Sequence, residues 1–318
     1  MHFDGSYFGT EESGEHGLLV IPSPSIVPDI ASRIGPSLVG PVVIPRTLSA
    51  PKIVVFDSGL GGLTVYRELV KARPDAHFVY AADDALFPYG KVEAAHLITR
   101  VTGLIGGLIE THRPDLVVIA CNTASTLVLP TLRARFSVLF IGTVPAIKPA
   151  CAASASKLVS VLGTEATVKR EYTRALIREF AAGCAVTLVG SPRLAGYAEA
   201  QLRGDPVADA AIAEEMAPCF VEKENARTDV IVLACTHYPL LAERMKALAP
   251  WPVAFLDPAP AIARRMVDLI GPAPAGADKA SSRAVFTGAP TPAPDLAAAL
   301  AGFGINTIEP LLATESER

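Results

Sequence analysis

The stretch DVIVLACTHYP (229–239) has a near copy earlier in the chain, DLVVIACNTAS (115–125). Each begins with an aspartate and continues as an aliphatic run that ends in Ala-Cys, with a threonine within the next two residues. Short apolar runs of this kind are typical of strands buried on both faces, as in parallel sheets covered by helices. Two such strands that end in cysteine indicate that one β/α pattern is used twice.

A second pair of similar segments, TVYRE (64–68) and TVKRE (167–171), occurs in the same order along the chain. Strand-like and helix-like segments alternate after residue 50, which predicts an α/β fold with mainly parallel sheets. We expect two pseudo-symmetric, doubly wound domains with the active site in the cleft between them. The expected strands are 52–56, 77–82, 116–120, 138–143, 157–163, 185–190, 229–234, 252–257, 284–288 and 305–309.

The length of 318 residues suits about two domains of roughly 100–200 residues each. We expect a first domain from 51–146 plus 257–318, because the last strands need a sheet to join, and a second domain from 147–256. Residues 1–50 are polar and acidic at first and then rich in proline, without the pattern of a secretory signal. They are expected to be a flexible N-terminal extension or to precede the true start codon; a regulatory arm is the alternative.

Charge and composition exclude several classes of partner. The net charge is −4 and the 28 basic residues form no long cluster, so nucleic acid and anionic membrane surfaces are not expected partners. No apolar run reaches the ~18 residues of a membrane-spanning helix. The five cysteines are odd in number and form no CxxC pair, which indicates reduced thiols in the cytoplasm. Metal-ligand spacing is also absent, so neither a metal nor another cofactor is expected.

Cys121 and Cys235 follow strands at their carboxyl ends, where ligands bind in open parallel sheets. A helix that begins there would lower the pKa of a thiol and attract carboxylates. Two thiols on opposite sides of a cleft suit the movement of a proton from one face of a carbon to the other. Packing in a core is the alternative for each thiol alone, and it is the role expected of Cys151, Cys184 and Cys219.

These cysteines lie within motifs that resemble the cofactor-independent glutamate racemases of the aspartate/glutamate racemase superfamily. The resemblance extends from about residue 52 to about residue 271. Its motifs are FDSGLGGLTV (56–65), FPYG (87–90), ACNTAS (120–125), GTVPAIKPA (142–150), LGTEATVKREYT (162–173) and ACTHYPLL (234–241).

The resemblance implies a two-base reaction without pyridoxal phosphate or metal, and D-glutamate made for peptidoglycan in a bacterial cytoplasm. In it, Cys121 deprotonates D-glutamate with help from Asp57, and Cys235 deprotonates L-glutamate with help from His237. Glutamate is the expected small-molecule partner, and a homodimer is left open. The implied substrate-binding residues are Asp57, Ser58, Tyr89, Gly90, Asn122, Thr123, Thr236 and His237, with Asp83 and Glu199 as a second tier.

Other functions remain open at this point. A racemase for aspartate or another amino acid would differ mainly in the length of the pocket. A cysteine–histidine hydrolase would use Cys235 as nucleophile and need no second thiol. An amino-acid-binding regulator would bind glutamate without exchanging its α-hydrogen. Asp57 could also simply cap the next helix. The SGLGG segment (58–62) lacks the lysine of a phosphate-binding P-loop.

Overall fold

The computed structural model describes residues 50–181, 183–288 and 293–310. The expected N-terminal extension (1–50) therefore lies outside the described residues, apart from Ala50. All ten strands that the sequence predicts are present, with ends that differ by a few residues. A hairpin of two very short strands, β7 (Glu222–Lys223) and β8 (Ala226–Arg227), was not predicted, because two residues are too few for a hydrophobic pattern.

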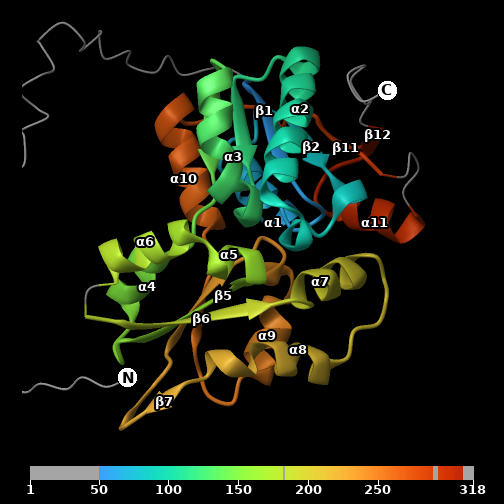
Figure 1. Ribbon diagram of the computed structural model, residues 1–318. Helices are drawn as coiled ribbons and strands as arrows, with labels where there is room; N and C mark the ends of the chain where they lie inside the picture. The colour runs from blue at the N-terminus through green and yellow to red at the C-terminus, as the bar shows by residue number, and fades with distance from the viewer. Residues whose placement is uncertain (1–49, 182, 289–292, 311–318) are drawn as a thin grey trace, which may run out of the picture. The chain divides into compact units, whose positions relative to one another are not determined.

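The larger sheet has six parallel strands in the order β12-β11-β2-β1-β3-β4. Its last two strands come from the C-terminal part of the chain and join the sheet beside β2 (Figure 1). Its strands are β1 (Lys52–Asp57), β2 (His77–Ala82), β3 (Leu116–Ile119), β4 (Leu139–Gly142), β11 (Ser282–Phe286) and β12 (Thr307–Pro310).

The smaller sheet has four parallel strands in the order β10-β9-β5-β6. Its strands are β5 (Leu158–Thr164), β6 (Ala185–Ser191), β9 (Val230–Ala234) and β10 (Ala254–Leu256). Read as β6-β5-β9-β10, it repeats the order β2-β1-β3-β4 of the larger sheet. The two cysteine-bearing strands β3 and β9 occupy equivalent places, which confirms the pseudo-symmetry expected from the sequence.

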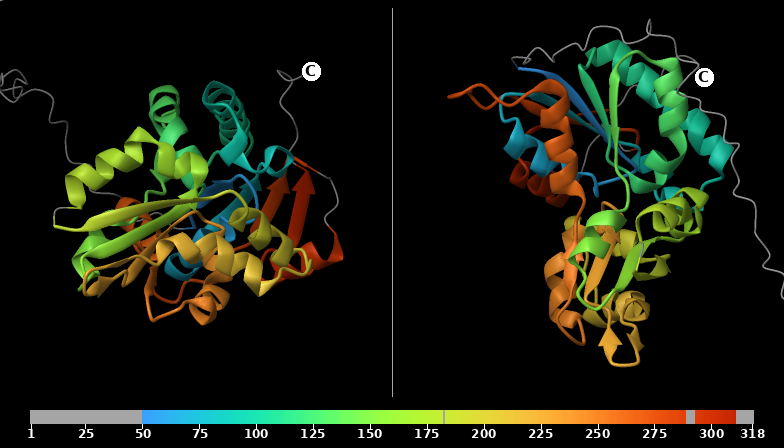
Figure 2. Two further views of the ribbon diagram at one scale, coloured as in Figure 1. Left: turned by 60° about the horizontal axis from the view of Figure 1, so that its bottom comes forward. Right: turned by 90° about the vertical axis from the view of Figure 1, so that its left-hand side faces the viewer.

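Helices cover both faces of each sheet, so the described residues form four hydrophobic cores (Figures 1 and 2). In the larger sheet α2 and α3 cover one face and α1, α10 and α11 the other. In the smaller sheet α7, α8 and α9 cover one face and α4 and α6 the other. The helices are α1 (Leu63–Ala72), α2 (Ala94–His112), α3 (Asn122–Arg135), α4 (Ile147–Ala153), α5 (Glu165–Lys169), α6 (Glu171–Phe180), α7 (Leu194–Leu202), α8 (Asp209–Met216), α9 (Ala242–Leu248), α10 (Ala259–Ile270) and α11 (Pro294–Gly302). Short 3₁₀ helices are η2 (Asp84–Leu86), η3 (Tyr89–Lys91), η4 (Ala217–Cys219) and η5 (Tyr238–Leu241).

The paired strands present functional residues at their carboxyl ends. β1 ends at Asp57 and β5 at Thr164, while β3 and β9 lead directly into Cys121 and Cys235. Within the described ranges, none of the helices combines the length and the apolar character needed to cross a membrane.

Candidate active site

Both strand-end cysteines line one small pocket, and both are buried. The pocket has a volume of about 20 Å³, which is room for roughly one water molecule. Its wall comes from the two halves of the fold. The lining residues are Ser58, Phe87, Pro88, Tyr89, Gly90, Cys121, Asn122, Thr123, Thr164, Ala195, Cys235, Thr236 and His237.

The glycine-rich turn between β1 and α1 passes directly against the side chains of the other half. A methyl group added at Gly61 would collide with the His237 ring, and one added at Gly59 would collide with the Glu199 carboxylate. Neither glycine has a positive φ. The turn therefore needs glycine at these positions for space and not for backbone conformation.

His237 connects Cys235 to a buried carboxylate. Its Nδ1 lies 3.8 Å from the Cys235 sulfur and its Nε2 lies 2.8 Å from Glu199 Oε1. The backbone N–H of Gly61 also points at Nε2, at 3.2 Å. Nε2 cannot accept that bond while it donates to Glu199. Because an ionised carboxylate only accepts hydrogen bonds, the shorter contact assigns the Nε2 proton to the Glu199 bond.

The charges around His237 favour its protonated form. Burial lowers its pKa, but the hydrogen bonds and charges of Cys235 and Glu199 outweigh that effect, and the pKa lies well above the usual value. Burial has the opposite effect on Glu199 and raises its pKa. The hydrogen bond and the charge of His237 lower the pKa of Glu199 by more, so it lies below the usual value. His237 can therefore sit beside Cys235 as an imidazolium, which stabilises a thiolate.

Cys121 has a different environment. It caps the amino-terminus of α3, and its sulfur donates to the Ser58 hydroxyl at 3.6 Å. Burial and the nearby Asp57 charge raise its pKa to about 12, although the Ala124 N–H and Ser58 lower it. The amino-terminus of α3 does lower the pKa, as expected, but burial is the larger effect and the net pKa is raised.

The two halves are thus less alike than their sequences suggested. The chain after Cys235 does not enter an α-helix directly: Tyr238 begins the 3₁₀ helix η5, and α9 starts only at Ala242. A helix amino-terminus is available to Cys121 alone, and a histidine to Cys235 alone.

Asp57 is fully buried beside both thiol-bearing segments. It accepts hydrogen bonds from the backbone of Gly59 and Gly62 and, at 3.3 Å, from the Thr236 hydroxyl. Burial raises its pKa, while the His237 charge and the Gly62 bond lower it. Since its bonds go to these groups, Asp57 influences Cys121 through its charge.

Asn122 and Thr123 form the floor beside Cys121. Neither the oxygen nor the nitrogen of the buried Asn122 amide has a hydrogen-bond partner, which costs roughly 1–3 kcal/mol for each unpaired group. Thr123 contacts the hydroxyls of Thr164 and Thr167 from the other half, at 3.2 and 3.3 Å. A polar ligand in the pocket would satisfy the Asn122 amide.

Asp83, which does not line the pocket, fixes the position of the Tyr89–Gly90 segment through a hydrogen bond to Tyr89. The Tyr89 hydroxyl donates to Asp83 at 2.6 Å, Arg100 makes a two-pronged ion pair with the same carboxylate, and Thr287 donates to it at 2.7 Å. Asp83 and Glu199 both lie behind the pocket wall rather than in it. They correspond to the second tier that the sequence analysis named.

Four lining residues were not among the sequence predictions: Phe87, Pro88, Thr164 and Ala195. Phe87 packs against the His237 ring with centroids 5.2 Å apart. Thr164 ends β5 as Asp57 ends β1, so the repeat itself contained the signal for Thr164. No comparable signal marks Ala195. In the described part of the chain, no group of three or more histidine, cysteine or acidic side chains is arranged to hold a metal.

Fold and pocket together define a class: a two-sheet, parallel α/β protein in which each half brings one strand-end thiol to a shared small-molecule pocket. The chain belongs to the Asp/Glu/Hydantoin racemase family, whose model matches residues 56–266.

Glutamate racemases from several bacteria are similar to this chain over most of their length. That of Brucella anthropi is 58% identical over 221 residues, which are 69% of this chain and 80% of that protein. That of Rhizobium meliloti is 52% identical over 261 residues, 80% of this chain and 93% of the relative. The crystal structure of Escherichia coli glutamate racemase, in complex with L-glutamate and the activator UDP-MurNAc-Ala, superposes with a TM-score of 0.76. It is 39% identical, over 83% of this chain and 99% of that one.

Proposed function

We propose that this protein is a glutamate racemase that interconverts L- and D-glutamate with two cysteine bases and no cofactor. The observation that carries the proposal is the convergence of Cys121 and Cys235 on one buried pocket. Each thiol comes from the carboxyl end of an equivalent strand, so the pseudo-symmetry of the fold supplies one base on each side of a bound carbon.

The protonation states of the two cysteines determine which enantiomer of glutamate the resting enzyme can deprotonate. Cys121, with a pKa of about 12, is a thiol at neutral pH. We assign the thiolate to Cys235 because its sulfur lies 3.8 Å from Nδ1 of His237. In this state the Cys235 thiolate removes the α-proton of L-glutamate, and the Cys121 thiol delivers its proton to the opposite face. The product is D-glutamate, with Cys235 now a thiol and Cys121 a thiolate, which is the state that accepts D-glutamate.

The intermediate carbanion needs stabilisation, because an α-proton of an amino acid is a very weak acid. The pocket offers hydrogen-bond donors from the Asn122 amide, from the Thr123 hydroxyl and from the N–H groups at the start of α3, whereas the Thr236 hydroxyl donates to Asp57. Donors fixed in a buried pocket stabilise charge as it develops on the α-carboxylate. Asp57 and Ser58 are proposed to bind the substrate ammonium group, and Tyr89 and Gly90 to line its side-chain end.

Similarity to glutamate racemases at 52–58% identity favours glutamate as the substrate over aspartate or another amino acid. A hydrolase that uses Cys235 would leave Cys121 without a role, and the shared pocket argues against it. A non-catalytic regulator would not need an imidazolium beside a thiol.

Three further expectations belong to this proposal. The five free cysteines suit a reducing cytoplasm. We propose domain boundaries at 51–146 plus 257–318 and at 147–256, in keeping with the membership of the two sheets. A homodimer is a hypothesis that the mass of the purified protein by light scattering would decide.

The test uses purified protein and L-glutamate in D₂O without added cofactor, followed by chiral chromatography and mass spectrometry. The proposal requires D-glutamate with deuterium at Cα, and loss of at least ~10³-fold in rate for both Cys121→Ala and Cys235→Ala. L-aspartate serves as the competing substrate. Absence of Cα exchange would reject a racemase, and an active Cys121→Ala variant would reject the two-base mechanism.

A further inference from the structure

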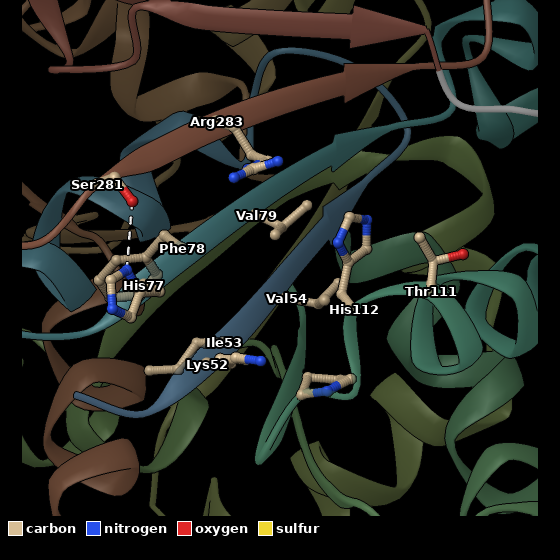
Figure 3. Close-up of a pocket in the computed structure, with 11 residues that line it drawn as sticks. Lys52, Ile53, Val54, His77, Phe78, Val79, Thr111, His112, Ser281 and Arg283 are labelled. Carbon is tan, nitrogen blue, oxygen red and sulfur yellow. Dashed lines mark hydrogen bonds between the residues drawn. The ribbon is translucent and has the colours of Figure 1, made fainter. Parts of the chain in front are cut away.

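A second, larger pocket lies at the amino-terminal ends of strands in the six-stranded sheet, whereas the thiols follow the carboxyl ends. It has a volume of about 370 Å³ and is lined by the amino-terminal ends of β1 and β2, by Arg283 near the start of β11, and by the end of α2 (Figure 3). Lys52, at the start of β1, is five residues from Asp57, which is about 16 Å at 3.3 Å per residue. The pocket is therefore separate from the one that holds the two thiols.

The strand pattern places basic side chains together in this pocket. Lys52 and His77 are paired directly across β1 and β2, and Arg283 on β11 pairs with Val79 of β2. Because side chains alternate along a strand, Lys52, His77, Arg283 and the buried Val79 all lie on the face covered by α2. α2 ends at His112, so it stops short of covering them.

The ionisable side chains of the lining are all basic. Lys52, His77, His112 and Arg283 supply cationic or titratable nitrogen, Thr111 and Ser281 supply hydroxyls, and none of the eleven lining residues is acidic. Figure 3 shows His77, His112 and Arg283 around Val79 at the pocket floor, with the bond from His77 to the Ser281 hydroxyl at 3.2 Å.

Two carboxylates stand near this group. Glu309 of β12 pairs with Arg283 at 3.2 Å, but the side chains are 42% and 45% exposed, and a surface pair of this kind contributes little. Asp115 accepts a bond from the backbone N–H of Lys52, not from its ammonium group. Burial and the charges of Arg283 and Lys52 lower the pKa of His112, whereas Glu309 raises it. The electrostatic potential in the pocket therefore stays positive despite these two carboxylates.

We propose that this pocket binds the phosphate group of a small molecule. Arg283 offers a planar fork that matches two phosphate oxygens, Lys52 adds a compact charge, and the hydroxyls and histidines can complete the shell. The volume exceeds that of inorganic phosphate and leaves room for a small ester over the apolar floor.

The test titrates inorganic phosphate, glycerol 3-phosphate and glycerol separately into the full-length protein, while NMR follows the imidazole signals of His77 and His112. Saturable shifts with both phosphates, and none with glycerol, are expected. Tighter binding of glycerol 3-phosphate identifies an ester as the preferred ligand, and tighter binding of phosphate identifies the free ion. Bound dianion should raise the pKa of His112.

Lys52→Gln and Arg283→Gln should each weaken binding by about tenfold. Matched controls are Lys246→Gln and Arg178→Gln, which remove the same charges from exposed ion pairs on α9 and α6. Equal weakening in the controls would show a general charge effect and overturn the proposal. The absence of saturable shifts, or unchanged affinity in Lys52→Gln and Arg283→Gln, would do so as well.

Discussion

The Glu199→Gln variant tests how the site activates Cys235. The substitution keeps the shape of the side chain and an oxygen that accepts the His237 Nε2 proton, but it removes the charge. A hydrogen bond to a charged group contributes about 1.5–3 kcal/mol and a neutral one about 1 kcal/mol. The loss is therefore roughly 0.5–2 kcal/mol, and the pKa of His237 should fall toward its ordinary value because the carboxylate charge is gone.

The expected kinetic result is a decrease of roughly tenfold in kcat/KM. Because two enantiomers have equal free energies, kcat/KM must fall by the same factor for L- and D-glutamate. Alkylation by iodoacetamide separates the thiols: Cys235 should react more slowly in Glu199→Gln at pH 7, while Cys121 keeps its low reactivity. Peptide mass spectrometry identifies the modified cysteine.

The matched control is Glu215→Gln, which changes another buried carboxylate in the same half. Glu215 pairs with Arg193 and Ser191 instead of with His237. It should lose stability without a selective change in the reactivity of Cys235. Unchanged alkylation and kcat/KM in Glu199→Gln would refute the role assigned to the His237–Glu199 pair.

The remaining predictions concern the supports of the pocket. Asp83→Asn removes the charge of a buried carboxylate that accepts bonds from Arg100, Tyr89 and Thr287, and should cost about 3 kcal/mol in the free energy of unfolding, measured in urea, and raise KM; full stability would contradict the role of this pair. Gly61→Ala should reduce kcat by roughly 10² as the new methyl group displaces His237, whereas Gly103→Ala, which meets open space in α2, should leave turnover unchanged; equal activity in both would show that the close approach is unimportant. Folding holds Cys121 in its thiol form, so the unfolded state loses this proton first, and Cys121 alone should contribute a fall in stability of about 1.4 kcal/mol per pH unit as pH rises from 9 to about 12. The Cys121→Ser variant should have a shallower slope over the same range, and an identical slope would show that this thiol does not titrate abnormally.

Much of the fold can be predicted from the chain because the strands are continuous apolar runs. All ten longer strands were located, and the repeat around Cys121 and Cys235 correctly predicted equivalent strands. The order of strands within each sheet could not be derived, since an apolar strand can pair with any neighbour. The short β7–β8 hairpin has no hydrophobic signal of its own.

The site was predictable where chemistry and local sequence coincide, as for Cys235 and His237. The sequence could not show that Glu199 reaches His237, because 38 residues separate them and only the packing of α7 brings them together. Nor could it show that burial outweighs the helix at Cys121. The net pKa of a buried thiol depends on its three-dimensional surroundings, which a sequence motif does not describe.

The isotopic content of substrate and product in D₂O tests the central claim most directly. If Cys235 takes the α-proton and Cys121 supplies another, D-glutamate formed early from L-glutamate carries one deuterium at Cα, while the unreacted L-glutamate remains protiated. Mass spectrometry of the separated enantiomers at low conversion measures both. Protium retained in the D-isomer, or deuterium appearing equally fast in both isomers, would mean that a single base serves both faces and would contradict the two-thiol account.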